Sequence, residues 1–176
     1  QVLEERMWAR SDLILYPADG ETAHVRDWLS TQGGNARAAT VPLYAYESVA
    51  ANPAANLDER RDLLFVAGFG HPPNADGAAW FVREVMPLLR SRHPGIHLHM
   101  VGSNPTEAVR ALASDEITVT GYVSDDELHD YYLRARVAIA PLRYGAGVKG
   151  KVNMAMSYGL PVVATPMAVE GMHVRA

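Results

Sequence analysis

The sequence contains no cysteine, no long apolar run and no excess of positive charge, and each absence excludes a class of protein. Without cysteine among its 176 residues, the chain has neither disulfide bonds nor thiolate-bound metal. No apolar run approaches the length of a membrane span, and the first residues lack a signal-peptide pattern, so we expect a cytoplasmic protein. The net charge of −4 and the lack of an arginine-rich stretch argue against a nucleic-acid partner.

The remaining composition is typical of a folded globular domain. Apolar residues make up 48% of the sequence and charged residues 20%. Short apolar runs that read as strands recur with helical segments between them, at residues 63–67, 96–101, 117–120, 137–140 and 161–164. This alternation predicts an α/β fold with a Rossmann-like, doubly wound parallel sheet.

Lysine is scarce, and its placement is informative. Fourteen basic residues are arginine, whereas the only two lysines, Lys149 and Lys151, lie together at a predicted helix start. A cation at a helix N-terminus is unfavourable by roughly 0.3–1 kcal/mol, so an anion that compensates both is expected there. Lysine is a compact point charge suited to a phosphate. Two solvated lysines on a surface turn are the alternative.

A glycine-rich loop precedes this pair, within the stretch 140–165 around which the chain is organised. Its glycines are Gly145, Gly147 and Gly150. The helix that follows is expected to bury one face, formed by Val148, Val152, Ala155 and Met156, before a buried strand at 161–164. Loop amides and helix N-terminus would then point at one anion, because the first amides of a helix lack intrahelical partners.

The order G-x-G-x-x-G at 145–150 also matches the dinucleotide fingerprint, but such a match alone is weak. In that fingerprint the loop follows the first strand, and an acidic residue ends the second. Here the loop follows the fourth strand, and the next strand ends in Thr165. The context argues against a nicotinamide or flavin site.

Other polar residues have local interpretations. His97 and His99 share a strand face without a third ligand nearby in sequence, which indicates a structural role. His71, in a loop at the ligand-binding edge of such sheets, has a better claim to function. Arg143, beside the glycine loop, is equally consistent with a phosphate contact and a surface position.

Helix starts are also marked by polar residues. Ser124 and Glu127 have the spacing of a capping box. Asn74 is expected to be the N-cap of the helix after the first strand of the main domain. A short helix is expected to start at Asn104 and Pro105.

The chain is expected to have three parts: residues 1–43, a linker at 44–61 rich in Ala, Asn and Pro, and a main domain at 62–176. The first part carries apolar residues that need cover, namely Leu13, Ile14, Leu15, Val25, Trp28 and Leu29. We expect this part to self-associate or to fold back onto its own sheet.

The main domain contains a series of motifs, which are FVAGFGHPPN at 65–74, LHMVG at 98–102, VTGYV at 119–123, AIAPL at 138–142, GAGVKGK at 145–151 and AMSYGLPVVAT at 155–165. In this order they resemble the C-terminal domain of family 4 (group 1) glycosyltransferases, which have the GT-B fold. The resemblance implies one lobe of a GT-B fold, with residues 1–43 as the tail of the N-terminal, acceptor-side lobe. The chain then looks like a fragment of a longer enzyme.

The resemblance also implies a function. The main domain would bind a nucleotide-sugar donor, and the longer enzyme would transfer the sugar to an acceptor (a glycan, lipid or small molecule) without metal or cofactor. The fragment alone is expected to bind a nucleoside diphosphate weakly and to transfer nothing.

The implied donor site lies at the carboxyl edge of the sheet. The diphosphate would lie on the amides of Gly147 and Val148, neutralised by Lys149 and Lys151, with the base near Gly102. The full set of expected donor-binding residues is Gly68, Gly70, His71, Gly102, Tyr122, Val123, Arg143, Gly147, Val148, Lys149, Lys151 and Met154. Catalytic residues are not identified.

The sequence departs from the family at two positions. Many members carry two glutamates eight residues apart, where this chain has Ala146 and Met154. The second glutamate holds the ribose hydroxyls in the family, and methionine is only a weak acceptor. Two alternatives stay open: a GT-B sugar-nucleotide epimerase, and a degenerate, non-catalytic donor-binding domain.

Overall fold

The computed structural model describes residues 2–32, 35–42, 58–145 and 147–172. The chain divides into two compact units, one formed by residues 1–45 with 170–176 and the other by residues 46–169. We call them the N-terminal unit and the sheet unit. The linker expected at 44–61 lies mostly outside the described residues.

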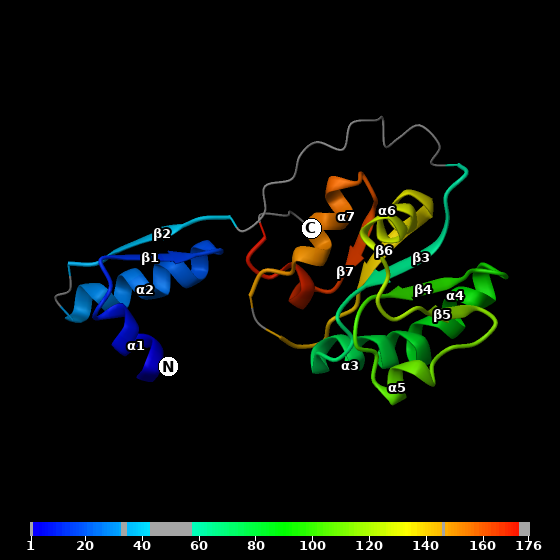
Figure 1. Cartoon of the computed structure of the whole chain (residues 1–176), viewed down its shortest axis with the longest axis horizontal. Coiled ribbons are helices and arrows are strands. Elements are labelled where there is room, and N and C mark those ends of the chain that lie inside the picture. The colour runs from blue at the N-terminus through cyan, green and yellow to red at the C-terminus, as the bar shows by residue number, and fades with distance from the viewer. Residues whose placement is uncertain (1, 33–34, 43–57, 146, 173–176) are drawn as a thin grey trace. The chain divides into compact units, whose positions relative to one another are not determined.

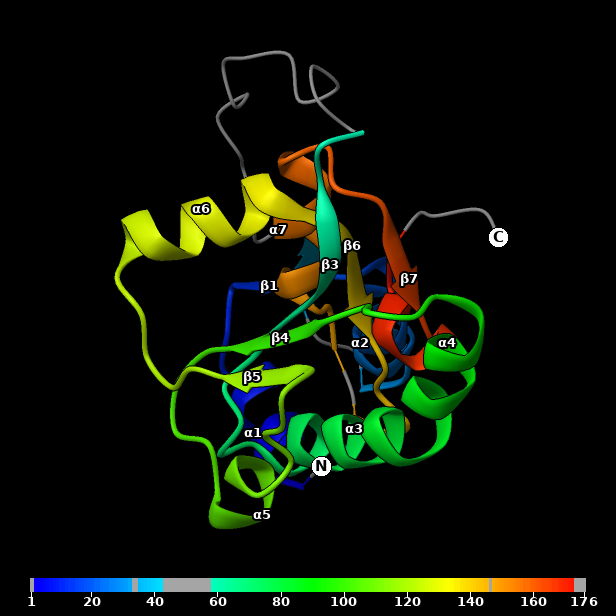
Figure 2. The same ribbon diagram turned by 90° about the vertical axis from the view of Figure 1, so that its right-hand side faces the viewer.

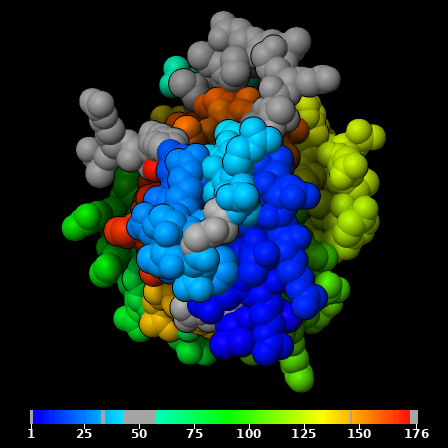
Figure 3. Space-filling model, turned by 90° about the vertical axis from the view of Figure 1, so that its left-hand side faces the viewer, coloured from blue at the N-terminus to red at the C-terminus, as the bar shows by residue number. Residues whose placement is uncertain are grey.

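The N-terminal unit is a small α/β arrangement. Its elements are α1 (Val2–Trp8), β1 (Leu13–Tyr16), α2 (Asp19–Gln32) and β2 (Arg37–Thr40). The two strands pair in parallel, from Leu13 opposite Arg37 to Tyr16 opposite Thr40. Figure 3 looks onto this unit, with α1 in dark blue beside the lighter blue α2.

The core of the N-terminal unit is aromatic. Trp8 is buried and meets Trp28 edge to face, with ring centroids 5.4 Å apart. Ile14, Val25 and Leu29 are buried in the same cluster. These three residues are therefore covered within the unit itself, where α2 packs against β1 and β2.

The other face of β1 remains open among the described residues. Leu13 and Leu15 alternate with Ile14 along the strand and are 50% and 54% exposed. Self-association of the first 43 residues stays a prediction.

The sheet unit is a five-stranded parallel sheet in the order β5-β4-β3-β6-β7. Its strands are β3 (Arg61–Val66), β4 (Leu98–Val101), β5 (Ile117–Val119), β6 (Ala135–Ala140) and β7 (Val162–Ala164). Its helical segments are α3 (Pro72–Trp80), the π-helix η1 (Phe81–Val85), α4 (Met86–Arg92), α5 (Glu107–Arg110), α6 (Asp125–Arg134), α7 (Gly150–Ser157) and the 3₁₀ helix η2 (Pro166–Val169). Figures 1 and 2 show α3, α4 and α5 on one face of the sheet and α6 and α7 on the other. The Rossmann-like, doubly wound fold is confirmed.

The central strand β3 is the most buried part of this sheet. Leu64 is 1% exposed, and Phe65 is fully buried and meets Phe69 edge to face at 5.3 Å. The last strand differs from expectation. Val163 is 65% exposed because β7 is an edge strand and not a buried one.

On α7, Val152 and Ala155 are buried as expected, but Met156 is 49% exposed. The inclusion of Met156 in the buried face is therefore wrong. The helix has only eight residues, and it ends one residue after Met156. Val152 and Ala155 are three residues apart, so they lie on one side of the helix and fill its contact with the sheet.

Two glycines allow backbones to approach closely. Gly102 has a φ of 142°, and a Cβ atom there would lie 2.0 Å from the carbonyl oxygen of Ala67. In α3, a Cβ atom on Gly77 would lie 2.6 Å from the carbonyl oxygen of Pro141. Neither distance is compatible with a side chain, so glycine is needed at both positions.

The helix starts follow the sequence in part. The capping box of Ser124 and Glu127 at the start of α6 is confirmed. The N-cap of α5 is Thr106 and not Asn104, because the Thr106 side chain accepts a hydrogen bond from the amide of Val109. No helix among the described residues is long and apolar enough to cross a membrane.

Candidate functional site

The candidate site lies at the carboxyl ends of the parallel strands, where the loops after β3, β4, β5 and β6 meet. Backbone hydrogen bonds join the first three loops. Phe69 donates to the carbonyl of Ser103 at 2.8 Å, and Gly102 donates to the carbonyl of Gly121 at 3.0 Å. Ligands of open α/β sheets bind outside this edge.

The two lysines flank the start of α7. Lys149 is the N-cap residue, and its ammonium group donates to the carbonyl of Gly147. Lys151 lies in the first turn, and its Nζ atom donates to Oδ1 of Asn74 at 2.6 Å. The same Nζ atom lies 5.8 Å from the centroid of the Phe65 ring. Lys149 is thus held by the glycine loop and Lys151 by the first turn of α3.

The environment of Lys151 disfavours its charged form, relative to that of a solvated lysine. Burial lowers the pKa of Lys151 to about 8, and the positive charge of Lys149 adds to this effect. Two cations lie close together here, and one of them is half-buried. A bound anion would be stabilised by both charges.

Asn74 is the residue of this edge that sequence reasoning misplaced. It is not the N-cap of α3, which is His71, but lies in the first turn of the helix with 6% exposure. Its Nδ2 atom donates to the carbonyl of Gly68 at 2.9 Å, while Oδ1 accepts from Lys151. Pro72 and Pro73 mark the helix start in the sequence, because proline favours the first helical positions. The helix therefore begins before Asn74.

Arg143 has a protein partner. Its Nε atom donates to Oδ2 of Asp76 at 2.8 Å, and its second nitrogen pairs with the other carboxylate oxygen. The hydrogen bond from Arg143 holds the pKa of Asp76 below its usual range. A bidentate pair of this kind favours the structural interpretation of Arg143 over a phosphate contact.

The other expected residues are spread around the edge. Gly68 and Gly147 are tied to Asn74 and Lys149 through their carbonyl groups. The remaining ones are Gly70 and His71 (exposed), Val148 (half-buried), Tyr122 (81% exposed) and Met154 (36% exposed). Val123 is half-buried and packs against the core cluster that includes Tyr132 of α6.

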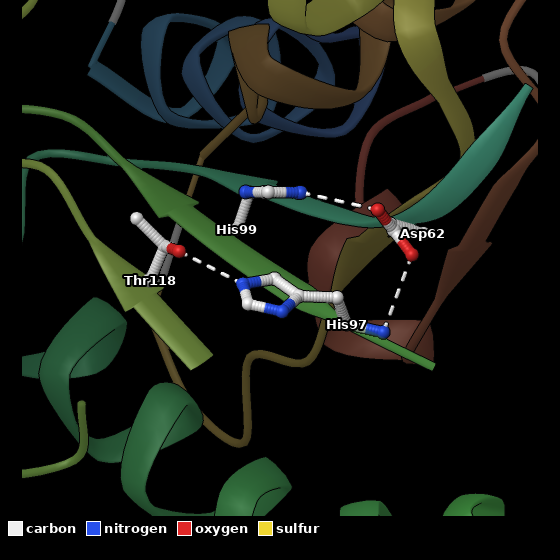
Figure 4. Close-up of polar contacts among 4 residues, drawn as sticks. All are labelled: Asp62, His97, His99 and Thr118. Carbon is white, nitrogen blue, oxygen red and sulfur yellow. Dashed lines mark hydrogen bonds and ion pairs between the residues drawn. The ribbon is translucent and has the colours of Figure 1, made fainter. Parts of the chain in front are cut away.

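His99 of β4 and His97, which directly precedes β4, belong to a separate cluster on the α6 face of the sheet (Figure 4). Nε2 of His97 lies 2.8 Å from the hydroxyl of Thr118, and Nε2 of His99 lies 3.3 Å from Oδ2 of Asp62. The rings are 4.6 Å apart. Within the described ranges, no three His, Cys, Asp or Glu side chains are grouped to hold a metal ion. The cluster joins β3, β4 and β5.

Burial of His97 and the charge of His99 lower the pKa of His97, and the carboxylates of Asp62 and Glu116 oppose the shift. The direction shows that burial outweighs the nearby carboxylates. The cluster therefore disfavours protonation of His97.

Solved structures share this fold. A sucrose-phosphate synthase from Thermosynechococcus elongatus matches 96% of the chain with a TM-score of 0.66 and 19% identity. A UDP-forming α,α-trehalose-phosphate synthase from Burkholderia xenovorans matches 95% with a TM-score of 0.66 and 12% identity. Both have the GT-B fold, as the resemblance implied. The chain spans 44% and 49% of their lengths.

Sequence comparison gives the family. A protein of Klebsiella pneumoniae, described as an uncharacterized 44.6 kDa protein in the cps region, is 30% identical over 117 residues. The match covers 62% of this chain and 30% of that protein. Residues 60–174 match the sequence profile of the family described as "Glycosyl transferases group 1". This match spans all five strands of the sheet unit, and the chain belongs to the group 1 glycosyltransferases.

Proposed function

We propose that the sheet unit binds the diphosphate of a nucleotide-sugar donor and that the chain is the donor half of a longer glycosyltransferase. One observation carries this proposal: the only two lysines of the sequence meet at the N-terminal end of α7, at the carboxyl edge of the sheet. The family match favours sugar transfer over the epimerase alternative.

The chemistry of the donor follows from these groups. The amides of Gly147 and Val148 and the ammonium groups of Lys149 and Lys151 would bind the two phosphates. When the glycosidic bond to the donor breaks, negative charge builds up on the diphosphate. Fixed cations and amides that stabilise this charge lower the barrier, and they can do so without a metal.

The nucleobase and the acceptor are assigned to other parts of the chain. Tyr122 presents an exposed ring beside Gly121, on the loop that is hydrogen-bonded to Gly102, and this ring is available to a nucleobase. Residues 1–43 would belong to the acceptor-side lobe, and the acceptor would be a glycan, a lipid or a small molecule. The family resemblance supports both assignments.

Calorimetry with UDP, GDP, ADP and TDP tests the proposal. We expect weak binding of one of them, and a loss of about 1.5–3 kcal/mol in Lys149→Ala and in Lys151→Ala, because each variant loses a charge-assisted contact. The affinity should also fall as salt is raised. Arg134→Ala removes an exposed positive charge at the far end of α6 and is the matched control. If both lysine variants bind with the affinity of the wild type, the lysines are solvated surface residues and do not form a diphosphate site.

The exposed Met154 supports one alternative, a donor-binding domain that no longer catalyses transfer. It offers only a thioether where the family has a carboxylate. Turnover of labelled nucleotide-sugars by the longer protein separates the two functions. Binding without turnover across UDP-, GDP-, ADP- and TDP-sugars would favour the non-catalytic one.

A further inference from the structure

The Asn74 side chain joins the loop after β3 to the first turn of α7. Its Nδ2 atom donates to the carbonyl of Gly68 in the loop after β3, at 2.9 Å. Its Oδ1 atom accepts from Nζ of Lys151 in α7, at 2.6 Å. The side chain is buried, with 6% exposure for the residue. A buried amide that is satisfied on both sides fixes both of its partners.

The two contacts require an asparagine or a residue with the same two functions. A lysine ammonium can only donate and a backbone carbonyl can only accept, so the residue between them must accept on one side and donate on the other. Aspartate would accept from Lys151 but would place a carboxylate against the carbonyl of Gly68. Leucine has a similar size and offers neither function.

Further contacts hold α3 against the same loop. The carboxylate of Asp76 pairs with Arg143, which follows β6. The backbone of α3 at Gly77 comes so close to the carbonyl of Pro141 that no Cβ atom would fit. The start of α3 is therefore fixed to the β6–α7 connection, and Asn74 is carried on a rigid element.

Lys151 needs such support because its surroundings disfavour the charged form. The amine is half-buried beside the Phe65 ring, close to a second lysine, and its pKa is lowered to about 8. A buried ammonium without an acceptor loses its proton more readily. The Oδ1 atom of Asn74 stabilises the charged form in this position.

We propose that Asn74 is a positioning residue of the donor site, which holds the Lys151 ammonium at the carboxyl edge of the sheet. An ammonium group has three N–H bonds, so a donor phosphate can accept from a second one while Asn74 keeps the first. The proposal rests on the proposed function, since it concerns the same diphosphate site.

The chain permits a direct measurement, because it has only two lysines. Labelling the lysine side chains with ¹³C at Cε gives two NMR signals, which Lys149→Gln assigns. In the wild type the Lys151 signal should titrate near pH 8. Asn74→Asp should raise this midpoint by about one pH unit or more, because a carboxylate replaces a neutral acceptor. Asn74→Leu should lower it, because the acceptor is lost.

Asn153→Asp is the matched control. It makes the same chemical change on α7 itself, two positions from Lys151 and so on another side of the helix. A Lys151 midpoint that responds to Asn74→Asp no more than to Asn153→Asp would overturn the inference. The Lys149 signal reports whether each variant keeps its fold around the site.

Binding completes the test. The affinity of the wild type for UDP and GDP should fall as the pH rises through about 8, and Asn74→Asp should move this fall to higher pH. If the wild type binds nucleotide and the pH dependence of its affinity is unchanged in Asn74→Asp and Asn74→Leu, the role of Asn74 is refuted while the proposed function stands. If the protein binds neither nucleotide but the titration midpoint of Lys151 still changes with substitutions of Asn74, the proposed function is refuted instead.

Discussion

Gly102 is expected to be essential for the fold of the sheet unit, and the effect of Gly102→Ala can be worked out from the backbone. Its φ of 142° lies in a region that a residue with a side chain rarely adopts, which costs about 1–3 kcal/mol. The new Cβ atom would also lie 2.0 Å from the carbonyl oxygen of Ala67. Overpacking of this kind adds about 1–3 kcal/mol. Together these effects predict a loss of about 2–6 kcal/mol.

The second effect cannot relax locally, because β3 and β4 are hydrogen-bonded on either side of the contact. Ala67 donates to Val101 at 3.0 Å, and Phe69 donates to Ser103 at 2.8 Å. Room for the methyl group requires that the two strand ends separate. We therefore expect faster amide hydrogen exchange in β3 and β4, together with a lower midpoint of urea unfolding measured by circular dichroism.

Gly121→Ala provides the control. Gly121 also has a positive φ, 80°, but nothing lies within 4 Å of the position of a Cβ atom. Its replacement should cost only the backbone term, about 1–2 kcal/mol. Equal losses in the two variants would contradict the inference that the close approach to Ala67 requires glycine at position 102.

Two other substitutions test the site and the histidine cluster. Met154→Glu introduces the carboxylate that binds the ribose in the resembled family. It should tighten nucleoside diphosphate binding by about 1.5–3 kcal/mol, measured by calorimetry. Equal or weaker affinity in a folded variant would place the ribose elsewhere. His97 has a lowered pKa in the folded protein, so the unfolded chain binds its proton first as the pH falls below about 6.5, and stability should decrease there. His97→Asn should reduce this pH dependence of the free energy of unfolding, measured with urea, whereas substitution of the exposed His93 in His93→Gln should not. If His97→Asn leaves the pH dependence below pH 6.5 unchanged, the dependence arises from other groups.

The sequence predicted the sheet well because its signals are local. Each apolar run of the first three strands ends near a glycine, Gly68, Gly102 or Gly121, and helical patterns lie between the runs. The capping box of Ser124 and Glu127 spans three residues, so it is also readable from sequence. These features depend on neighbours along the chain and not on the tertiary fold.

The polar contacts of the site were not predictable in the same way. Asn74 and Lys151 are 77 positions apart, and Asp76 and Arg143 are 67 apart. Only the packing of α3 against the β6–α7 connection brings these side chains together. Sequence reasoning placed both lysines in the expected site, treated Asn74 as a helix cap and left Arg143 undecided, because the partners of Asn74 and Arg143 do not lie nearby in the sequence.

The lowered pKa of Lys151 also makes it a nucleophile. At pH 8 about half of the Lys151 amines are neutral, roughly a hundredfold more than for an ordinary lysine with a pKa near 10.4. Since the sequence has only two lysines, both at this edge, an amine-directed acylating reagent has no other lysine to modify. A reagent that reaches Lys151 would therefore acylate the residue that is proposed to bind the donor phosphate.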